Sequence, residues 1–320
     1  MPARVGASRH GSSGVVERGN APRFNEASTY GDALRWATAR LEESPTARLD
    51  AELLLAHAAG LRRAELLAMA RDPLPDSVIA ALDVAVRRRA AGEPVAYITG
   101  VAYFHSLRLA VTPDVLVPRP ETEMLVEWAL GRIRDRRRDL RVLDVGTGSG
   151  AIVLAIAASG ACAEALDAGA CELHATDTSA EALAVARSNA RRLGLADRVA
   201  WHRADLLPGG SGSFDLVVAN LPYVAESEMG EVQPGVLAYE PRGALLAGTD
   251  GLDQIRRLLR VLPARLARDG AVALEIGWRQ GPAVACLARE SFPSATVTVR
   301  QDFAGHDRMA MIELLDDREP

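Results

Sequence analysis

The sequence predicts an α/β fold with a mostly parallel sheet, preceded by a small helical domain. From residue 122 onward, strand patterns alternate with helix patterns, which is typical of a parallel sheet with helices on both faces. A glycine-rich turn joins the first of these strands to a helix at 142–152. Ahead of this region, residues 29–92 carry apolar side chains at helical spacing. Together the three observations favour two domains of different architecture.

The N-terminal part of the chain divides into three predicted segments. Residues 1–28 are polar and contain many Gly and Ser residues, so we expect a disordered tail. Helix-period apolar positions over 29–92 predict a helical bundle, for which Thr29 is the expected N-cap of the first helix. Alternating apolar residues and several prolines over 93–121 predict a β-hairpin linker.

The remaining residues, 122–320, are expected to form the α/β domain with seven strands. The expected strands are 141–145, 172–176, 199–204, 215–220, 271–277, 296–301 and 308–314. The expected helices are 122–132, 151–159, 179–194, 252–267 and one near 280–291. The last two strands are close in sequence, which indicates an antiparallel pair at one edge of the sheet. A long segment before the second strand, around 159–171, leaves the register of that strand open.

Composition excludes several kinds of chemistry. The 320 residues contain 37 basic residues, and all of them are arginine because the chain has no lysine. A Walker A loop, a Schiff base and a protein-kinase site all require lysine, so these are ruled out. Three cysteines without CxxC spacing argue against a disulfide framework or a structural zinc site, and we expect a reducing cytoplasm. No apolar run is long enough to span a membrane.

Charge gives a weaker indication of the partners. The net charge is -5, which argues against stable binding of nucleic acid. One basic run, with six arginines between 132 and 141, is interpreted as a solvated loop between a helix and a strand.

The segment VLDVGTGSGAI (142–152) has the form of a cofactor site. Its glycines allow backbone to approach a ligand closely, at the start of a helix. The spacing also satisfies G-x-G-x-x-A, so a dinucleotide remains a competitor. Asp144 favours a ligand with an ammonium group over a pyrophosphate, because like charges repel. S-adenosyl-L-methionine fits this requirement, and the predicted cofactor-binding residues of the turn are Asp144, Gly146, Thr147, Gly148, Ser149 and Gly150.

Two further carboxylates extend the predicted cofactor site. Asp177 follows the second strand, where a carboxylate can accept hydrogen bonds from ribose hydroxyls; its alternative is a helix N-cap. Asp205 follows the third strand and could accept from an adenine amino group, or could simply belong to a turn. Leu206 could cover the adenine face. No metal ion is required by this set of residues.

The tetrapeptide Asn220-Leu221-Pro222-Tyr223 ends the fourth strand and is the predicted catalytic and substrate-binding motif. A planar amide or amino nitrogen is a poor nucleophile because its lone pair is delocalised. The side-chain oxygen of Asn220 and the carbonyl of Leu221 could each accept one N–H of such a nitrogen and favour positive charge on it. Pro222 would aim that carbonyl and Tyr223 could stack on the planar group, while Asn220 would also border the cofactor. An ordinary strand-end turn is the alternative.

Taken together, these motifs resemble the HemK/PrmC family of glutamine N5-methyltransferases, which act on peptide chain release factors. The matching segments are GEPVAYITG and Phe104 (92–104), VLVPRPETE (115–123), DVGTGSG (144–150), YEPRGALLAG-DG (239–251), LEIGWRQG (274–281) and DFAGHDR (302–308). The resemblance implies a Rossmann-like class I methyltransferase domain that uses S-adenosyl-L-methionine. It also implies an N-terminal helical domain that helps to dock class I release factors, whose Gly-Gly-Gln glutamine is the substrate. We expect the protein to act as a monomer.

One departure from the family keeps alternatives open. The family usually has Asn-Pro-Pro-Tyr, and Leu221 stands here in place of the first proline. Asn-Leu-Pro-Tyr also resembles the adenine N6-dimethyltransferases of ribosomal RNA, and both substrates present a planar NH2 group. An adenine-N6 methyltransferase acting on rRNA or DNA is therefore the main alternative, and a NAD-dependent oxidoreductase is a more distant one.

Overall fold

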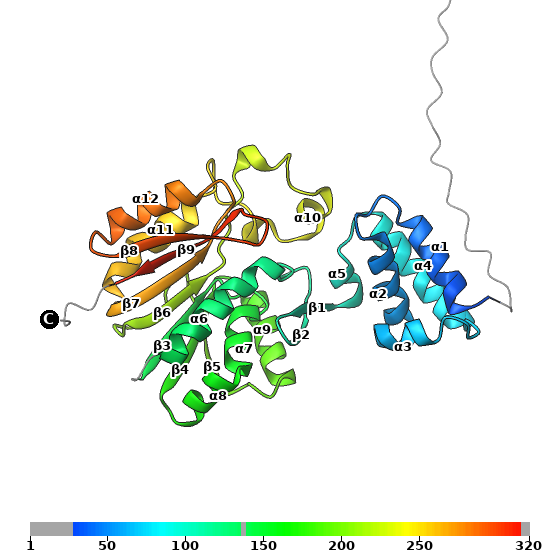
Figure 1. Cartoon of the computed structure of the whole chain (residues 1–320), viewed down its shortest axis with the longest axis horizontal. Coiled ribbons are helices and arrows are strands. Elements are labelled where there is room, and N and C mark those ends of the chain that lie inside the picture. The colour runs from blue at the N-terminus through cyan, green and yellow to red at the C-terminus, as the bar shows by residue number, and fades with distance from the viewer. Residues whose placement is uncertain (1–27, 136–138, 315–320) are drawn as a thin grey trace, which may run out of the picture. The chain divides into compact units, whose positions relative to one another are not determined.

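A computed structural model describes residues 28–135 and 139–314. The chain divides into two compact units, Met1–Arg87 and Arg88–Pro320, which are treated separately below (Figure 1). Almost all of the predicted tail, the arginines at 136–138 and the last six residues lie outside the described part of the chain.

The first unit is helical. It contains α1 (Tyr30–Arg40), α2 (Ala47–Ala59), α3 (Arg63–Ala68) and most of α4 (Asp76–Ala90). Helix α1 begins with a capping box, as the Thr29 hydroxyl accepts from the amide of Asp32 and the Asp32 carboxylate accepts from the amide of Thr29. The prediction of Thr29 as an N-cap is thereby confirmed. Leu34, Leu54 and Leu82 are buried, one from each of the three longer helices.

The second unit opens with a short helix and a hairpin. Helix α5 (Val95–Thr99) precedes β1 (Val101–Phe104) and β2 (Leu107–Ala110), which pair antiparallel. The turn residue His105 has a positive φ of 52°, and its amide donates to Glu123 at 2.7 Å. The hairpin is therefore hydrogen-bonded to the first residue of helix α6 (Glu123–Asp135).

Seven strands form the main sheet, in the order β5-β4-β3-β6-β7-β9-β8. The first five are parallel to one another, and β9 runs antiparallel to both of its neighbours. This confirms the predicted fold class, including the antiparallel pair at the edge. The strands are β3 (Leu140–Val145), β4 (Cys171–Asp177), β5 (Val199–Arg203), β6 (Phe214–Ala219), β7 (Leu266–Glu275), β8 (Thr296–Gln301) and β9 (Asp307–Glu313).

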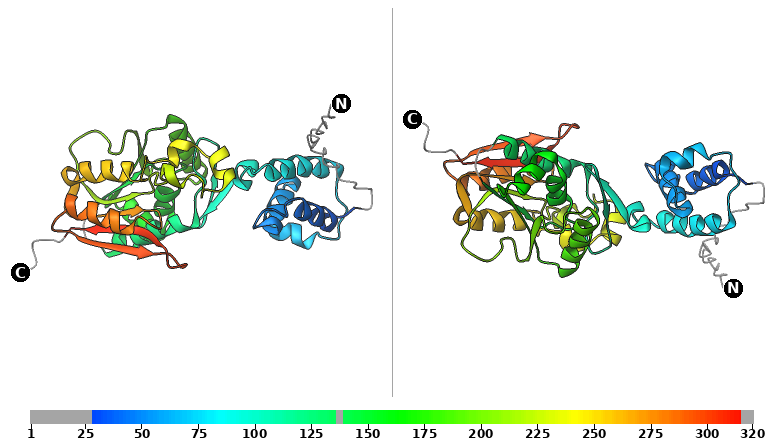
Figure 2. Two further views of the ribbon diagram at one scale, coloured as in Figure 1. Left: turned by 90° about the horizontal axis from the view of Figure 1, so that it is seen from above. Right: turned by 90° about the horizontal axis from the view of Figure 1, so that it is seen from below.

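Helices cover both faces of this sheet (Figure 2). The residues of β3 alternate between two cores: Val142 packs into a core with the helices α6 and α7, and Leu143 packs into one with α11 and α12. The helices of the unit are, besides α5, α6 (Glu123–Asp135), α7 (Ala151–Ala158), α8 (Gly160–Asp167), α9 (Ala180–Arg192), α10 (Pro234–Tyr239), α11 (Asp253–Val261) and α12 (Gly281–Ser291).

Several details differ from the sequence prediction. Helix α5 lies within the predicted hairpin linker, α10 was not expected, and two further differences concern α11 and α8. The helix expected over 252–267 ends at Val261, and a 3-10 turn over Leu262–Ala264 leads into β7 at Leu266. Pro263 lies in that turn and has no amide hydrogen for a continuing α-helix. The long segment before the second strand contains the extra helix α8, whose first turn is capped by the Ser159 hydroxyl. Strand β4 then pairs in register from Cys171 opposite Leu140, which answers the open question of its register.

Candidate cofactor and substrate site

A cavity of about 490 Å³ lies at the carboxyl ends of the parallel strands, within the second unit. It is bordered by the turn after β3, the ends of β4 and β5, and the first residues after β6. Eight of the ten predicted cofactor residues line it, namely Gly146, Thr147, Gly148, Ser149, Asp177, Asp205, Leu206 and Asn220. Gly150 and Asp144 do not.

The glycine turn has the backbone conformation that its sequence suggested. Gly146 and Gly148 have φ of 73° and 54°, in the left-handed region that disfavours side chains. A Cβ at Gly146 would lie 3.0 Å from Leu221 Cδ2, whereas a Cβ at Gly148 would meet no atom within 4 Å. The turn therefore packs against the Leu221 side chain on one side and leaves open space beside Gly148.

Asp177, the last residue of β4, joins this turn to the following helix. Its Oδ2 accepts from the amide of Gly148 at 2.9 Å, and its Oδ1 accepts from the amide of Ser179 at 2.9 Å. The N-cap of α9 is Ser179, whose hydroxyl accepts from Ala182. A carboxylate has about four lone-pair sites, so Asp177 can still accept hydrogen bonds from a ligand in the cavity.

Asp144 lies beneath the glycine turn and is completely buried. Its Oδ2 accepts from the Thr147 hydroxyl at 2.7 Å and from the amide of Val153 at 3.3 Å. Within the described part of the chain, Oδ1 has no hydrogen-bond partner. Burial raises the pKa of this carboxyl to about 7. The Asp144 side chain thus stabilises the glycine turn through its hydrogen bond with Thr147, while its Oδ1 is an unsatisfied polar atom.

The far end of the cavity contains Asp205 and Leu206. Asp205 pairs with Arg257 at 2.5 Å, and Arg257, which the sequence did not single out, also lines the cavity. Leu206 has a positive φ of 66°, and its carbonyl accepts from the buried hydroxyl of Thr176 at 2.7 Å. This hydrogen bond helps to hold a backbone conformation that a leucine rarely adopts.

A second cavity, of about 350 Å³, adjoins the motif that follows β6. Tyr223, Arg119, Val232, Val236 and Leu245 are among its lining residues. Asn220 lines both cavities, as do Leu116 and Ala244. The two cavities therefore share part of their walls at Asn220, so groups bound in them would lie close together, as direct group transfer requires.

Buried polar contacts hold the Asn220–Tyr223 segment. The side-chain NH2 of Asn220 donates to the Thr122 hydroxyl at 3.0 Å, and the Tyr223 hydroxyl donates to Glu275 at 3.3 Å. The carbonyl of Tyr223 accepts from the Gln280 side chain at 2.9 Å. Sequence reasoning did not assign roles to Thr122, Glu275 or Gln280, although all three lie within segments that carried the family resemblance.

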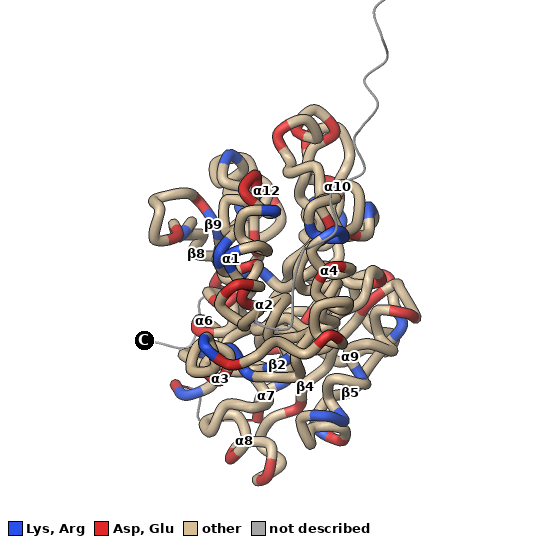
Figure 3. The backbone as a smooth tube through the Cα atoms, turned by 90° about the vertical axis from the view of Figure 1, so that its right-hand side faces the viewer, with Lys and Arg blue, Asp and Glu red and all other residues tan. Residues whose placement is uncertain are grey.

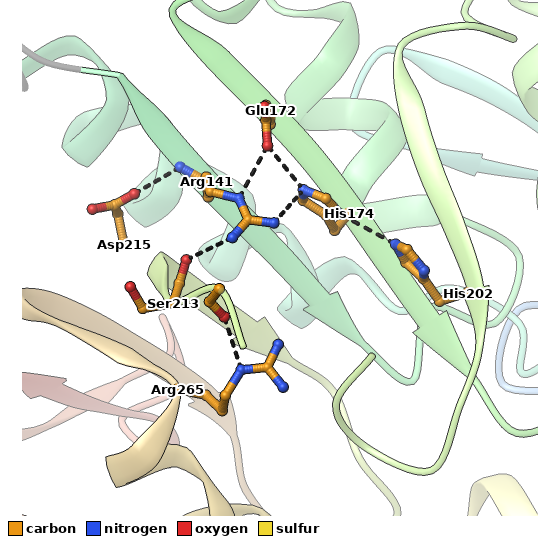
Figure 4. Close-up of polar contacts among 8 residues, drawn as sticks. Arg141, Glu172, His174, His202, Ser213, Asp215 and Arg265 are labelled. Carbon is orange, nitrogen blue, oxygen red and sulfur yellow. Dashed lines mark hydrogen bonds and ion pairs between the residues drawn. The ribbon is translucent and has the colours of Figure 1, made fainter. Parts of the chain in front are cut away.

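A separate polar cluster occupies the opposite end of strands β3 and β4 (Figure 4). Arg141 donates to Glu172 at 3.0 Å and lies 3.4 Å from His174, whose Nδ1 lies 3.1 Å from His202 Nε2. Burial lowers the pKa of both histidines. None of these residues lines the cavity at the glycine turn, so the cluster belongs to the fold rather than to the site.

The fold and the site together define a class I methyltransferase. A family model for the PrmC N-terminal domain matches residues 32–100, and one for a methyltransferase domain matches 142–233. The release factor glutamine methyltransferase of Bordetella pertussis is 43% identical over 82% of this chain and 93% of its own length. That of Bacillus subtilis is 37% identical over 88% of this chain and 96% of its own.

A solved structure belongs to the same group of proteins. The release factor-specific protein-(glutamine-N5) methyltransferase of Alicyclobacillus acidocaldarius is 29% identical, covers 64% of this chain and 99% of its own, and has a TM-score of 0.38. On the sequence matches, the chain belongs to the release factor glutamine methyltransferase family. The resemblance inferred from the motifs is thereby confirmed.

Proposed function

We propose that the protein transfers a methyl group from S-adenosyl-L-methionine to the side-chain nitrogen (N5) of the glutamine in the Gly-Gly-Gln motif of class I peptide chain release factors, and so modulates translation termination. The observation that carries the proposal is the position of Asn220 at the boundary of two adjoining cavities. One cavity has most of the residues expected for the cofactor, and the other is lined by Tyr223 and by apolar side chains. The curated relatives are named for this activity.

The residues of the larger cavity fit the cofactor. The open space beside Gly148 permits close approach of a ligand to the backbone, and Asp177 can accept hydrogen bonds from ribose hydroxyls. Leu206 supplies an apolar wall and Asp205 an acceptor for the adenine amino group. Asp144 does not line this cavity, so its carboxyl would act on the ammonium group only indirectly, through Thr147, which donates to it and borders the cavity. When bound, S-adenosyl-L-methionine supplies an electrophilic methyl group.

The Asn220–Tyr223 segment supplies what the amide nitrogen needs. Asn220 and Tyr223 line the smaller cavity, whereas Leu221 and Pro222 line the larger one. Asn220 Oδ1 accepts one N–H of the substrate glutamine, and the main-chain carbonyl of Leu221 accepts the other. As the N–C bond forms and the S–C bond of the methyl donor breaks, positive charge moves from sulfur to the nitrogen. Both acceptors stabilise this charge, and the proton then passes to water. Tyr223 packs against the planar amide, and Pro222 restricts the backbone that aims the Leu221 carbonyl. Because the acceptor at Leu221 is a backbone group, it is retained without the family's usual proline.

The domain roles and partners follow from the same proposal. The helical segment 29–92 would dock the release factor, and the segment 122–320 would carry out methyl transfer. The hairpin segment 93–121 would link these two domains. Acidic and basic residues are interspersed along the backbone of the described chain, which favours a protein substrate over a nucleic acid (Figure 3). None of the helices in the described ranges meets the length and apolarity needed to cross a bilayer. We expect a cytoplasmic monomer without stable nucleic-acid binding.

Incubation with radiolabelled S-adenosyl-L-methionine tests the proposal. An unmodified release factor should accept label, and a release factor with Gly-Gly-Ala in place of Gly-Gly-Gln should not. Label on ribosomal RNA but not on the release factor would instead support the adenine-N6 alternative.

A further inference from the structure

A chain of hydrogen bonds runs from a buried carboxylate to Asn220. Glu275 is the last residue of β7 and is 2% exposed. Its Oε2 accepts from the Thr122 hydroxyl at 2.6 Å, and Thr122 is itself 3% exposed. The Thr122 oxygen in turn accepts from the side-chain NH2 of Asn220 at 3.0 Å. The second oxygen of Glu275 accepts from the Tyr223 hydroxyl, so one carboxylate is linked to both polar side chains of the substrate motif.

The protons in this chain can point in only one direction when Glu275 is ionised. An ionised carboxylate only accepts hydrogen bonds. The Thr122 hydroxyl has a single hydrogen, which it donates to Glu275, so toward Asn220 it can only accept. The amide edge of Asn220 that faces Thr122 must therefore be the NH2 group. The oxygen consequently lies on the opposite edge of the same planar amide.

The orientation of the Asn220 amide needs to be fixed, because an asparagine amide has nearly the same shape after a 180° flip. A flipped Asn220 would present its NH2 group to the NH2 group of the substrate, and two donors would then face each other. The acceptor that favours charge on the reacting nitrogen would be lost, although the side chain would still fill its space.

We infer that Thr122 and Glu275 are positioning residues, which hold the amide of Asn220 in the orientation that accepts a hydrogen bond from the substrate nitrogen. The inference rests on the proposed function, since it concerns how Asn220 acts on the substrate. Thr122 also borders the larger cavity, whereas Glu275 does not, and in this scheme neither residue bonds to the reacting atoms. Thr122 acts directly on Asn220, and Glu275 acts by fixing the direction of the Thr122 hydrogen.

The surroundings of Glu275 link this order to pH. Burial raises the pKa of this carboxyl to about 7, and the nearby Glu121 acts in the same direction. Arg308 on β9 and the hydrogen bonds from Thr122 and Tyr223 oppose the rise. A protonated Glu275 can donate to Thr122, which can then donate to a flipped Asn220. The NH2 group of Asn220 is thus forced to face Thr122 only when Glu275 is ionised.

The central test compares Thr122→Val, which keeps the shape but loses the hydroxyl, with Thr122→Ser, which keeps the hydroxyl. We expect Thr122→Val to lower kcat by about tenfold or more, with little change in cofactor affinity or thermal midpoint. Thr122→Ser should restore kcat to within about threefold of the wild type. A Thr122→Val enzyme with wild-type kcat would overturn the inference, and so would an equal loss in both variants.

A double-mutant cycle separates positioning from a general structural effect. If Thr122 acts only through Asn220, Thr122→Val should cause no further loss of single-turnover rate in an Asn220→Ala background. Losses that multiply would contradict the inference. These outcomes differ from failure of the proposed function, in which the wild-type enzyme itself would not label the release factor.

A pH profile tests the part played by Glu275. The wild-type kcat should rise with pH around a midpoint near 7, as Glu275 ionises. In Glu275→Gln the amide oxygen can still accept from Thr122 and nothing titrates at this position, so that rise should be absent. A rise of the same size and midpoint in Glu275→Gln would show that Glu275 does not control the orientation.

Discussion

Replacement of Asn220 by alanine should separate catalysis from cofactor binding. The substitution removes the acceptor that we propose for one substrate N–H, while the Leu221 carbonyl remains. Loss of a single well-placed group of this kind costs about 3–4 kcal/mol of transition-state stabilisation, or about 10²- to 10³-fold in kcat. Cofactor affinity should change by less than about threefold, because the oxygen acts mainly on the transition state.

The fold should tolerate this change. Asn220 is partly buried and donates to Thr122, whose hydroxyl would keep its own bond to Glu275. No buried donor is left without a partner in this group, so the unfolding free energy should fall by at most about 1.5 kcal/mol. Single-turnover methyl transfer to a release factor gives the rate, and calorimetry with S-adenosyl-L-methionine gives the affinity. A rate within tenfold of the wild type would refute the role assigned to Asn220.

Three other substitutions test separate parts of the account. Asp177→Ala removes the acceptor of the Gly148 and Ser179 amides and the acceptor that we propose for the ribose, so the cofactor Kd from calorimetry should rise at least about tenfold; an unchanged Kd would exclude the ribose role. Leu221→Pro keeps the backbone acceptor and should give similar or higher methyl-transfer activity, whereas a large loss would show that the packing of the Leu221 side chain against the glycine turn is needed. Asp144→Asn tests the buried carboxyl. The folded-state pKa of Asp144 is raised to about 7, so the fold favours the protonated carboxyl. This contribution to the unfolding free energy is fully present below the unfolded-state pKa and is lost as pH rises through about 7. Urea unfolding would give the unfolding free energy at pH 5 and at pH 8. Between these two pH values, the unfolding free energy of the wild type should fall by about 1–3 kcal/mol more than that of Asp144→Asn, and equal falls would contradict this.

The strands and the glycine turn were predictable because their signals are local. Largely apolar segments such as 140–145 and 214–219 occupy the centre of the sheet, and their alternation with helices indicated that the sheet is parallel. The end of the helix at 252–267 was predicted wrongly because apolar residues continue past Pro263 into β7. The proline was the local signal that should have ended it.

Long-range side-chain contacts could not be predicted from the sequence. Thr122 and Glu275 are separated by 153 residues and meet only because the start of α6 lies beside the end of β7. The depth of Asp144 below the turn also depends on the packing of α7, whose Val153 amide donates to it. Motif spacing indicated which segments converge, but not which oxygen accepts from which donor.

Methyl transfer with a release factor and ribosomal RNA in competition tests the central claim most directly. Isotopically labelled S-adenosyl-L-methionine would be added with both substrates, and the position of the label would be determined by tandem mass spectrometry of the protein and of RNA digests. The account predicts one methyl group on the side-chain nitrogen of the Gly-Gly-Gln glutamine and none on adenine. A label on adenine with an unmodified glutamine would contradict it.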